Sequence, residues 1–306
     1  MRGTHGEKLV ATINSEKTPK EDVSRLNEAL STYDKWILDL NSTDGETLDE
    51  LIGNLVELLN QYKTYIDVNL IFDSPKDFLY RQKGQLKLDN TVIEEFLPIF
   101  VSKCLVKKFG YCDIAIGSQI ATFSSVFFAS SLSTPNIGGG ISIKTKDQDF
   151  SMSRKLYIKS SYESNFPPEN TVTMETNIGY VLAELKTNLD KTMFQEASAT
   201  AHDVKQAVTG AKYYLLCDFL DMTPISTATT DIDEILIVRK AKRINSNIRK
   251  AFNTYEGRQS HREWYINYLN DNPYSVDMFK RFLEHILSLM ANEELIEESV
   301  LEVGYF

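Results

Sequence analysis

A short run at positions 177–187, NIGYVLAELKT, constrains the fold of this chain more than any other stretch. Apolar residues fill both faces of an extended chain over positions 181–183 and at 185, which is the pattern of a strand buried inside a sheet. Glu184 and Lys186 interrupt this pattern, and both project to one side because alternate residues of a strand share a face. A carboxylate and an ammonium in such a setting must pair or hold an ion. The run therefore predicts either a salt bridge at a strand end or part of a metal-dependent active site.

The segments around this strand predict an α/β region in which strands precede and follow a helix. Positions 141–161 are strand-like, and the length and composition of 189–211 predict a helix. Two further apolar runs, KYYLLCDFL at 212–220 and DEILIVRK at 233–240, predict strands. Upstream, NTVIEEFLPIFVSKCLVKKFG at 90–110 predicts another helix, whereas the Ser-rich stretch after it is only weakly patterned.

Helical patterns dominate both ends of the chain. Positions 20–66 contain two runs with apolar residues at helical spacing, and the last third is helical with a break at Pro273. We therefore expect a helical N-terminal region at 1–89, an α/β core at 90–250 and a C-terminal helical region at 251–306. The first of these regions is expected to contact DNA or another subunit if the core is a nuclease.

The charge distribution leaves nucleic acid open as a partner, although the net charge is −10. Residues 1–70 hold 13 acidic and 7 basic side chains, and residues 284–306 hold 6 acidic and no basic ones, so the middle of the chain is slightly basic. Within it, RKAKRINSNIRK at 239–250 has six bases and no acid. Such a run is either a solvated face or a nucleic-acid contact.

The cysteines and the apolar segments are typical of a cytosolic protein. Cys104, Cys112 and Cys217 have no metal-ligand spacing and no even count for a disulfide framework. The N-terminal residues lack the apolar segment of a signal peptide, and the most apolar stretch, at 114–132, carries too many polar residues for a membrane span. We therefore expect a cytoplasmic location and no membrane partner.

A second carboxylate strengthens the interpretation of Glu184 and Lys186 as a site. Asp149 lies 35 positions before Glu184, where antiparallel neighbouring strands can bring the two together. Two close carboxylates do not both stay ionised without a cation, and their hard oxygens suit Mg²⁺, which would bind a phosphate oxygen and acidify a water held by the lysine. Asp147 has the same strand parity and is an alternative ligand, unless both aspartates only cap a turn. The intervening insertion offers Glu169 and Glu175 as competing acids.

Asp149 followed by Glu184-Leu185-Lys186 resembles the PD-(D/E)XK nuclease signature. The stretches TVIEEFLPIF, TKDQDF, VLAELKTNLDKTMFQEASATA and TDIDEILIVRK, in this order, resemble the BbvCI-like, two-subunit (type IIT) restriction endonucleases over about half of the chain. This resemblance implies a PD-(D/E)XK core, a mixed central sheet flanked by helices, with a helical N-terminal region and a helical C-terminal appendage. No proline precedes Asp149, which departs from the signature.

The resemblance also implies roles for individual residues. Asp149, Glu184 and Lys186 are expected to be catalytic, and the two carboxylates are expected to hold Mg²⁺. Accessory acids are expected at Asp147, at Glu94 or Glu95 on a helix near the site, and at Glu196 on the following helix. For DNA binding, the basic residues expected to contact phosphates are Arg154, Lys155, Lys159, Arg239, Lys240, Lys242 and Arg243.

The activity implied by the resemblance is Mg²⁺-dependent, sequence-specific hydrolysis of double-stranded DNA in a bacterial restriction system. Each subunit would cut one strand, so the chain is expected to act with a homologous second subunit or with a copy of itself. A homodimeric enzyme on a palindromic site, a repair nuclease with the same core, and a non-catalytic DNA-binding subunit are the alternatives. An α/β protein in which the Glu-Leu-Lys sequence is incidental would cut no DNA.

Overall fold

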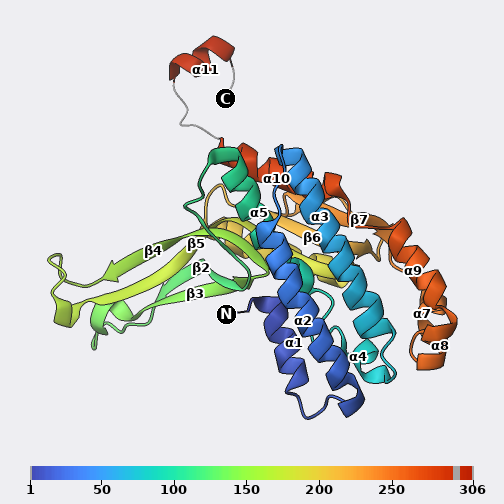
Figure 1. The fold of residues 1–306 in the computed structure, drawn as a ribbon. Coiled ribbons are helices and arrows are strands. Elements are labelled where there is room, and N and C mark those ends of the chain that lie inside the picture. The colour runs from blue at the N-terminus through green and yellow to red at the C-terminus, as the bar shows by residue number, and fades with distance from the viewer. Residues whose placement is uncertain (1, 292–296, 305–306) are drawn as a thin grey trace.

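A computed structural model of the chain describes residues 2–291 and 297–304 (Figure 1). A seven-stranded mixed sheet forms its centre, and helices cover both faces. The strands are β1 (Ala115–Gly117), β2 (Ile120–Phe128), β3 (Ile141–Gln148), β4 (Phe150–Ser160), β5 (Val172–Leu189), β6 (Lys212–Leu220) and β7 (Glu234–Lys242). The α-helices are α1 (Thr4–Ile13), α2 (Lys20–Ser42), α3 (Leu48–Thr64), α4 (Asp77–Gln82), α5 (Thr91–Phe109), α6 (Lys191–Ala207), α7 (Ser246–Ala251), α8 (Tyr255–Ser260), α9 (Arg262–Asp271), α10 (Val276–Met290) and α11 (Glu297–Val303). A π-helix, η1 (Tyr65–Phe72), continues α3, and short 3₁₀ turns are η2 (Ile137–Gly140), η3 (Pro168–Asn170) and η4 (Thr227–Thr229).

The long strand β5 organises the sheet. Its first part pairs antiparallel with β4, and its last part pairs parallel with β6, which in turn pairs parallel with β7. The other strands join β4 and β5 in the order β1-β4-β5-β2-β3. The predicted mixed sheet flanked by helices is therefore confirmed, as are the strands β6 and β7 and the helix α6 between them and β5.

One sequence prediction for the region before β5 was wrong, and one stretch had no predicted structure. The segment 141–161 is not one strand: the chain bends at Asp149, because β3 pairs with β2 whereas β4 pairs with β1 and β5. The weakly patterned stretch after α5 forms β1 and β2. Its last residues, Val126, Phe127 and Phe128, are exposed, and the inside-outside alternation of a half-buried strand is therefore lost there.

The N-terminal helices, α5, α10 and one face of the sheet share a single hydrophobic core. Leu26 and Trp36 of α2, Leu55 of α3 and Phe100 of α5 lie in it together with Phe282 of α10. A second apolar cluster lies between the opposite face of the sheet and α6. The three sequence regions thus pack as one body around the sheet (Figure 1).

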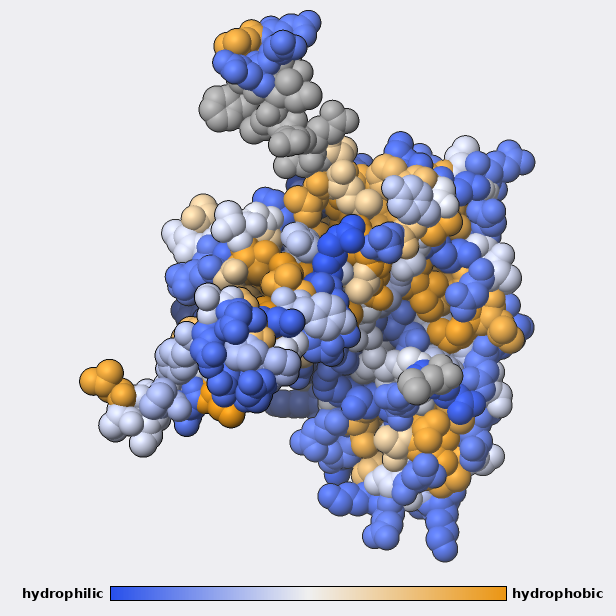
Figure 2. Space-filling model, turned by 90° about the vertical axis from the view of Figure 1, so that its left-hand side faces the viewer, coloured by the Kyte–Doolittle hydropathy of each residue, from blue (hydrophilic) through white to orange (hydrophobic). Residues whose placement is uncertain are grey.

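The outer halves of β2, β3, β4 and β5 project from this body as an arm (Figure 1). Figure 2 views the side from which the arm projects and shows apolar surface interspersed with hydrophilic residues. Exposed apolar side chains of the arm include Phe128, Leu132, Tyr157, Tyr162 and Phe166. Among the described helices, none is both long enough and apolar enough to cross a membrane.

Candidate active site

The side chains of strand β5 alternate between the two faces of the sheet, as the sequence pattern predicts. Ala183 and Leu185 are buried in the large core, whereas Leu182 packs against α6 in the second cluster. Glu184 and Lys186 therefore project to the α6 side, where their side chains are 19% and 25% exposed. The Lys186 ammonium lies 2.6 Å from Glu184 Oε1, so the half-buried acid and base compensate each other.

Asp149 lies beside this pair because of the register between β4 and β5. Phe150 pairs with Ala183, and the preceding residue is thereby placed next to Glu184. The Leu185 backbone N–H donates a hydrogen bond of 2.9 Å to Asp149 Oδ2. The bend between β3 and β4 thus turns the Asp149 carboxylate toward β5, and the structure brings the three residues of the signature together.

Negative charge accumulates at this position. Burial and the neighbouring Glu184 raise the pKa of Asp149 above its ordinary value, although the hydrogen bond from Leu185 opposes the shift. Glu94 of α5 is fully buried, and burial together with Asp149 raises its pKa to about 7. The Gln119 side-chain amide connects them, lying 3.1 Å from Glu94 Oε2 and 3.4 Å from Asp149 Oδ1. A bound cation would relieve this repulsion.

The donor set fits a hard divalent cation only in part. The carboxylate oxygens of Asp149 and Glu184 are the ligand type that Mg²⁺ prefers. Among the described residues, no three His, Cys, Asp or Glu side chains are grouped so that they could hold a metal ion by themselves. A Mg²⁺ ion at this site would therefore keep several water ligands, which is its usual behaviour in proteins.

Neighbouring groups fix the orientation of Glu184 and the charge state of Lys186. The buried Tyr213 hydroxyl donates a hydrogen bond of 3.0 Å to Glu184 Oε2, so both oxygens of this carboxylate are held. Burial lowers the pKa of Lys186, but Glu184, Asp149 and Glu196 outweigh it and raise the pKa above its ordinary value. Lys186 is therefore an ammonium and acts as a hydrogen-bond donor.

The structure separates the accessory acids. Of the two glutamates on α5, Glu94 faces Asp149, whereas Glu95 accepts a hydrogen bond of 2.9 Å from the His5 backbone N–H and lies away from the pair. The geometry thus favours Glu94 over Glu95. Asp147 is exposed and lines the same cleft as Asp149. Glu196 is exposed on α6 and acts on Lys186 through its charge.

The three signature residues open into a cleft with a cavity volume of about 550 Å³. One wall comes from the end of β3, including Lys146 and Asp147, and the floor comes from the end of β5. The opposite wall is formed by α4 and the turn after it, with Arg81, Lys83 and Lys87. Sequence reasoning missed this wall, which precedes the predicted core boundary at position 90. The only signal was three bases in the short run RQKGQLK.

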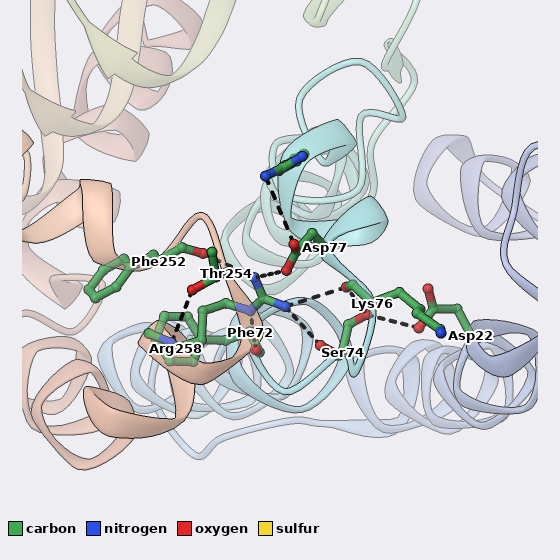
Figure 3. Close-up of polar contacts among 10 residues, drawn as sticks. Asp22, Phe72, Ser74, Lys76, Asp77, Phe252, Thr254 and Arg258 are labelled. Atoms are coloured by element: carbon green, nitrogen blue, oxygen red, sulfur yellow. Dashed lines mark hydrogen bonds and ion pairs between the residues drawn. The ribbon is translucent and has the colours of Figure 1, made fainter.

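A buried arginine anchors this wall to the C-terminal helices (Figure 3). Arg258 of α8 has no exposed surface and donates hydrogen bonds to the backbone carbonyls of Phe72, Ser74 and Phe252, at 2.8, 2.9 and 3.0 Å. It also donates to Asp77 Oδ1, at 3.0 Å, at the start of α4. The connection between η1 and α4 is therefore tied to α8, and the position of the cleft wall depends on the C-terminal region.

The basic residues expected at the DNA fall into three groups. Arg154, Lys155 and Lys159 are exposed on the arm, and Lys155 lies 3.3 Å from Glu175. Arg243 lines the cleft, where it pairs with Asp221 at 2.6 Å.

The third group lies outside the cleft. Arg239 is only 3% exposed, and its guanidinium lies 3.9 Å from the centre of the Tyr274 ring, so the expectation that Arg239 contacts DNA was wrong. Lys240 pairs with Asp277 of α10 at 2.8 Å, away from the cleft. Lys242 is exposed and does not line the cleft.

Comparison with known proteins gives one family and one similar structure. A family model described as the Bpu10I restriction endonuclease matches residues 85–306, a range that includes Asp149, Glu184 and Lys186 but not the part of the cleft wall from Tyr80 to Gly84. A solved structure described as the native BbvCI A2B2 tetramer at low resolution is similar to this chain, with 17% identity, 80% of this chain and 86% of that chain covered, and a TM-score of 0.49. No curated protein sequence matches. The chain belongs to the Bpu10I restriction endonuclease family and is a site-specific deoxyribonuclease.

Proposed function

We propose that this endonuclease hydrolyses one strand of a specific duplex DNA sequence in a Mg²⁺-dependent reaction, with Asp149, Glu184 and Lys186 as its catalytic residues. The observation that carries the proposal is their convergence in one cleft. Asp149 is hydrogen-bonded to the backbone between the other two, and Lys186 lies 2.6 Å from Glu184. Restriction of duplex DNA is the activity of the family, and a carboxylate pair beside a lysine suits the hydrolysis of a phosphodiester.

Each residue has a distinct role in this proposal. Asp149 and Glu184 would hold the metal, and Tyr213 keeps the Glu184 carboxylate oriented by its hydrogen bond. A bound Mg²⁺ supplies positive charge to the scissile phosphate and makes a nearby water more acidic. Lys186 would donate a hydrogen bond to the attacking water and direct it at phosphorus. The products carry a 5′-phosphate and a 3′-hydroxyl.

The DNA lies across the cleft and continues along the arm in this proposal. Arg243 lines the cleft, and Arg154, Lys155 and Lys159 follow β4 outward from Asp149. These basic side chains give sequence-independent contacts to phosphates, which position the duplex but do not distinguish one nucleobase from another. Binding is therefore expected to weaken steeply as the salt concentration rises.

A second subunit follows from the number of strands. The chain brings an Asp, Glu and Lys set together, and a second such set would allow both strands of a duplex to be cut within one complex. We propose that the chain works with a homologous subunit or with a second copy of itself in the bacterial cytoplasm. Light scattering of the isolated chain, repeated after mixing with a candidate partner, distinguishes the two arrangements.

Plasmid cleavage tests the proposal. Supercoiled plasmid of mixed sequence is incubated with Mg²⁺ and the wild-type chain, the Lys186→Ala variant or the Lys35→Ala variant, each alone and with a candidate partner. Lys35 is exposed on α2 and does not line the cleft, and it serves as the matched control. We expect discrete nicked or linear products from wild type and Lys35→Ala, and a loss of at least about 100-fold in rate for Lys186→Ala.

Three outcomes would contradict parts of the proposal. Discrete products that survive Lys186→Ala would place the active site elsewhere. No cleavage by any mixture, with DNA binding intact, would indicate a non-catalytic binding subunit. Cleavage that persists in a chelator would remove the metal from the reaction.

A further inference from the structure

Lys87 has a backbone conformation that its residue type disfavours. It follows α4 in the cleft wall and has a φ of 54°, in the left-handed region where a side chain crowds the following carbonyl. The Leu88 N–H bonds to the Lys83 carbonyl at 3.0 Å, and the Lys87 N–H bonds to the Gly84 carbonyl at 3.3 Å. These two bonds form the turn that ends many helices, in which the left-handed position is usually glycine. Lysine therefore occupies the position at a cost in stability.

The fold gives no packing reason for a lysine there. Lys240 also has a positive φ, of 49°, but its strain has a local cause. The register between β6 and β7 shifts there, from the pair Cys217–Ile237 to the pair Phe219–Ala241, which is a β-bulge. The Lys240 side chain then pairs with Asp277. For Lys87, the structure describes no comparable ion pair, and its strain has to be explained by what its ammonium faces.

The basic side chains of the cleft differ in whether they have an ion-pair partner. Six basic side chains line it. Five of them pair with carboxylates: Arg81 with Asp77, Lys83 with Asp89, Lys146 with Asp203, Lys186 with Glu184, and Arg243 with Asp221. Within residues 2–291 and 297–304, the sixth, Lys87, has no carboxylate within 4 Å of its ammonium. It is the cation of the cleft that a substrate anion can reach without breaking an ion pair.

Lys87 also lies at the junction of two hollows in the surface. It lines both the catalytic cleft and a neighbouring cavity of about 440 Å³, which is bordered by Lys8, Glu95 and Gln119. Its charge acts on both Glu94 and Asp149, so the ammonium is near the acidic side of the site. A nucleic-acid strand that leaves the cleft on this side would pass Lys87.

We propose that Lys87 binds a DNA phosphate next to the scissile phosphate. Its strained left-handed backbone directs the ammonium into the cleft for this contact. The inference rests on the proposed function, because it assumes that DNA occupies the cleft. It adds a substrate-binding residue from outside the predicted core. Backbone strain retained at a substrate-facing position is a recurring property of functional sites.

Binding of a fluorescent, mixed-sequence duplex tests the proposal without knowledge of the recognition site. Anisotropy titrations in a chelator, at several salt concentrations, compare wild type with Lys87→Gln, Lys87→Arg and Lys87→Gly. We expect Lys87→Gln and Lys87→Gly to bind about tenfold more weakly, and to reduce the slope of log K against log salt by about 0.9. Lys87→Arg keeps the charge and is expected to keep the wild-type slope.

Thermal unfolding separates substrate binding from a structural role. Lys87→Gly relieves the backbone strain, so we expect its Tm to rise by roughly 2 °C while its DNA affinity falls. Lys35→Gln is the control for binding: it removes a lysine charge from α2 outside the cleft, and its affinity and salt slope should equal those of wild type.

Two results would overturn the inference. Wild-type affinity and slope in both Lys87→Gln and Lys87→Gly would mean that no phosphate contacts Lys87. A fall in Tm for Lys87→Gly would mean that lysine stabilises the turn. Failure of the proposed function is recognised separately, as an absence of Mg²⁺-dependent plasmid cleavage by wild type with its partner.

Discussion

Replacing Arg258 by alanine should destabilise the protein more than replacing any exposed arginine, although Arg258 is far from Asp149, Glu184 and Lys186 in sequence. The alanine removes a guanidinium with no exposed surface and leaves the carbonyls of Phe72, Ser74 and Phe252 without their donor. The same change removes the contact with Asp77 at the first residue of α4.

The hydrogen bonds set the magnitude. A buried acceptor that loses its partner costs about 1–3 kcal/mol, and the three carbonyls relax in part when the side chain is gone. We therefore expect the free energy of unfolding to fall by about 3–5 kcal/mol, which is the range measured when a buried ion pair loses one member. Domains are typically stable by about 5–15 kcal/mol, so the variant remains folded but loses a large fraction of its stability.

Arg262 provides a matched control. It comes from the next helix and holds the same connection through three hydrogen bonds of 2.8–3.0 Å to Asp73, but its side chain is 40% exposed. Arg262→Ala should therefore cost about 1 kcal/mol or less. Urea titration followed by tryptophan fluorescence measures both variants, and Arg258→Lys should fall between wild type and Arg258→Ala because lysine lacks the fork of donors.

The comparison refutes the reasoning if the two alanine variants lose the same stability, or if Arg258→Ala loses less than about 1 kcal/mol. Either result would mean that water or a shifted backbone satisfies the three carbonyls. A loss of stability without a loss of DNA affinity, measured where the variant is folded, would show that α4 keeps its place without Arg258.

Two further predictions concern the acids of the site. Tyr213→Phe removes the donor to Glu184 Oε2, and we expect Mg²⁺-dependent cleavage to fall about tenfold with little change in Tm; an unchanged rate would show that Lys186 alone orients the carboxylate. The pKa of Glu94 is raised from 4.5 to about 7 by burial and Asp149, so its contribution to stability is complete below pH 4.5 and is lost as the pH rises through about 7. In a chelator, the unfolding free energy should fall by up to about 3 kcal/mol across this interval, and Glu94→Gln should flatten the curve. A wild-type curve that rises between pH 5 and 8, or equals that of Glu94→Gln, would contradict the assignment.

The local periodicity of the sequence was sufficient to predict those helices and strands that pack against their neighbours in the chain. The alternation of β5 fixed which of its side chains face α6, because the side-chain direction of a strand reverses at every residue. It thereby placed Glu184 and Lys186 on one face before any contact was known. The helix α6 and the strands β6 and β7 follow from the same local patterns.

Arg239, Glu94 and the bend at Asp149 depended on contacts between distant segments. The basic run at 239–250 gives no sign that Arg239 is buried against Tyr274. Tyr274 comes from the segment between α9 and α10, and another neighbour of Arg239, Asp218, comes from β6. Glu94 and Glu95 are neighbours on one helix. Only the packing of α1 against α5 decides that Glu95 accepts a hydrogen bond from the His5 backbone N–H.

The sequence by itself determined the strands β5, β6 and β7, the helix α6 and the chemical identity of the Asp, Glu and Lys set, since these depend on residue type and short-range spacing. The tertiary structure decided which segments wall the cleft. The turn with Lys87 and the anchor from Arg258 are separated by more than half of the chain, and only the packing of η1, α4 and α8 brings them to one side of the site. Long-range packing carries no local periodicity, so the sequence pattern does not show which segments lie together.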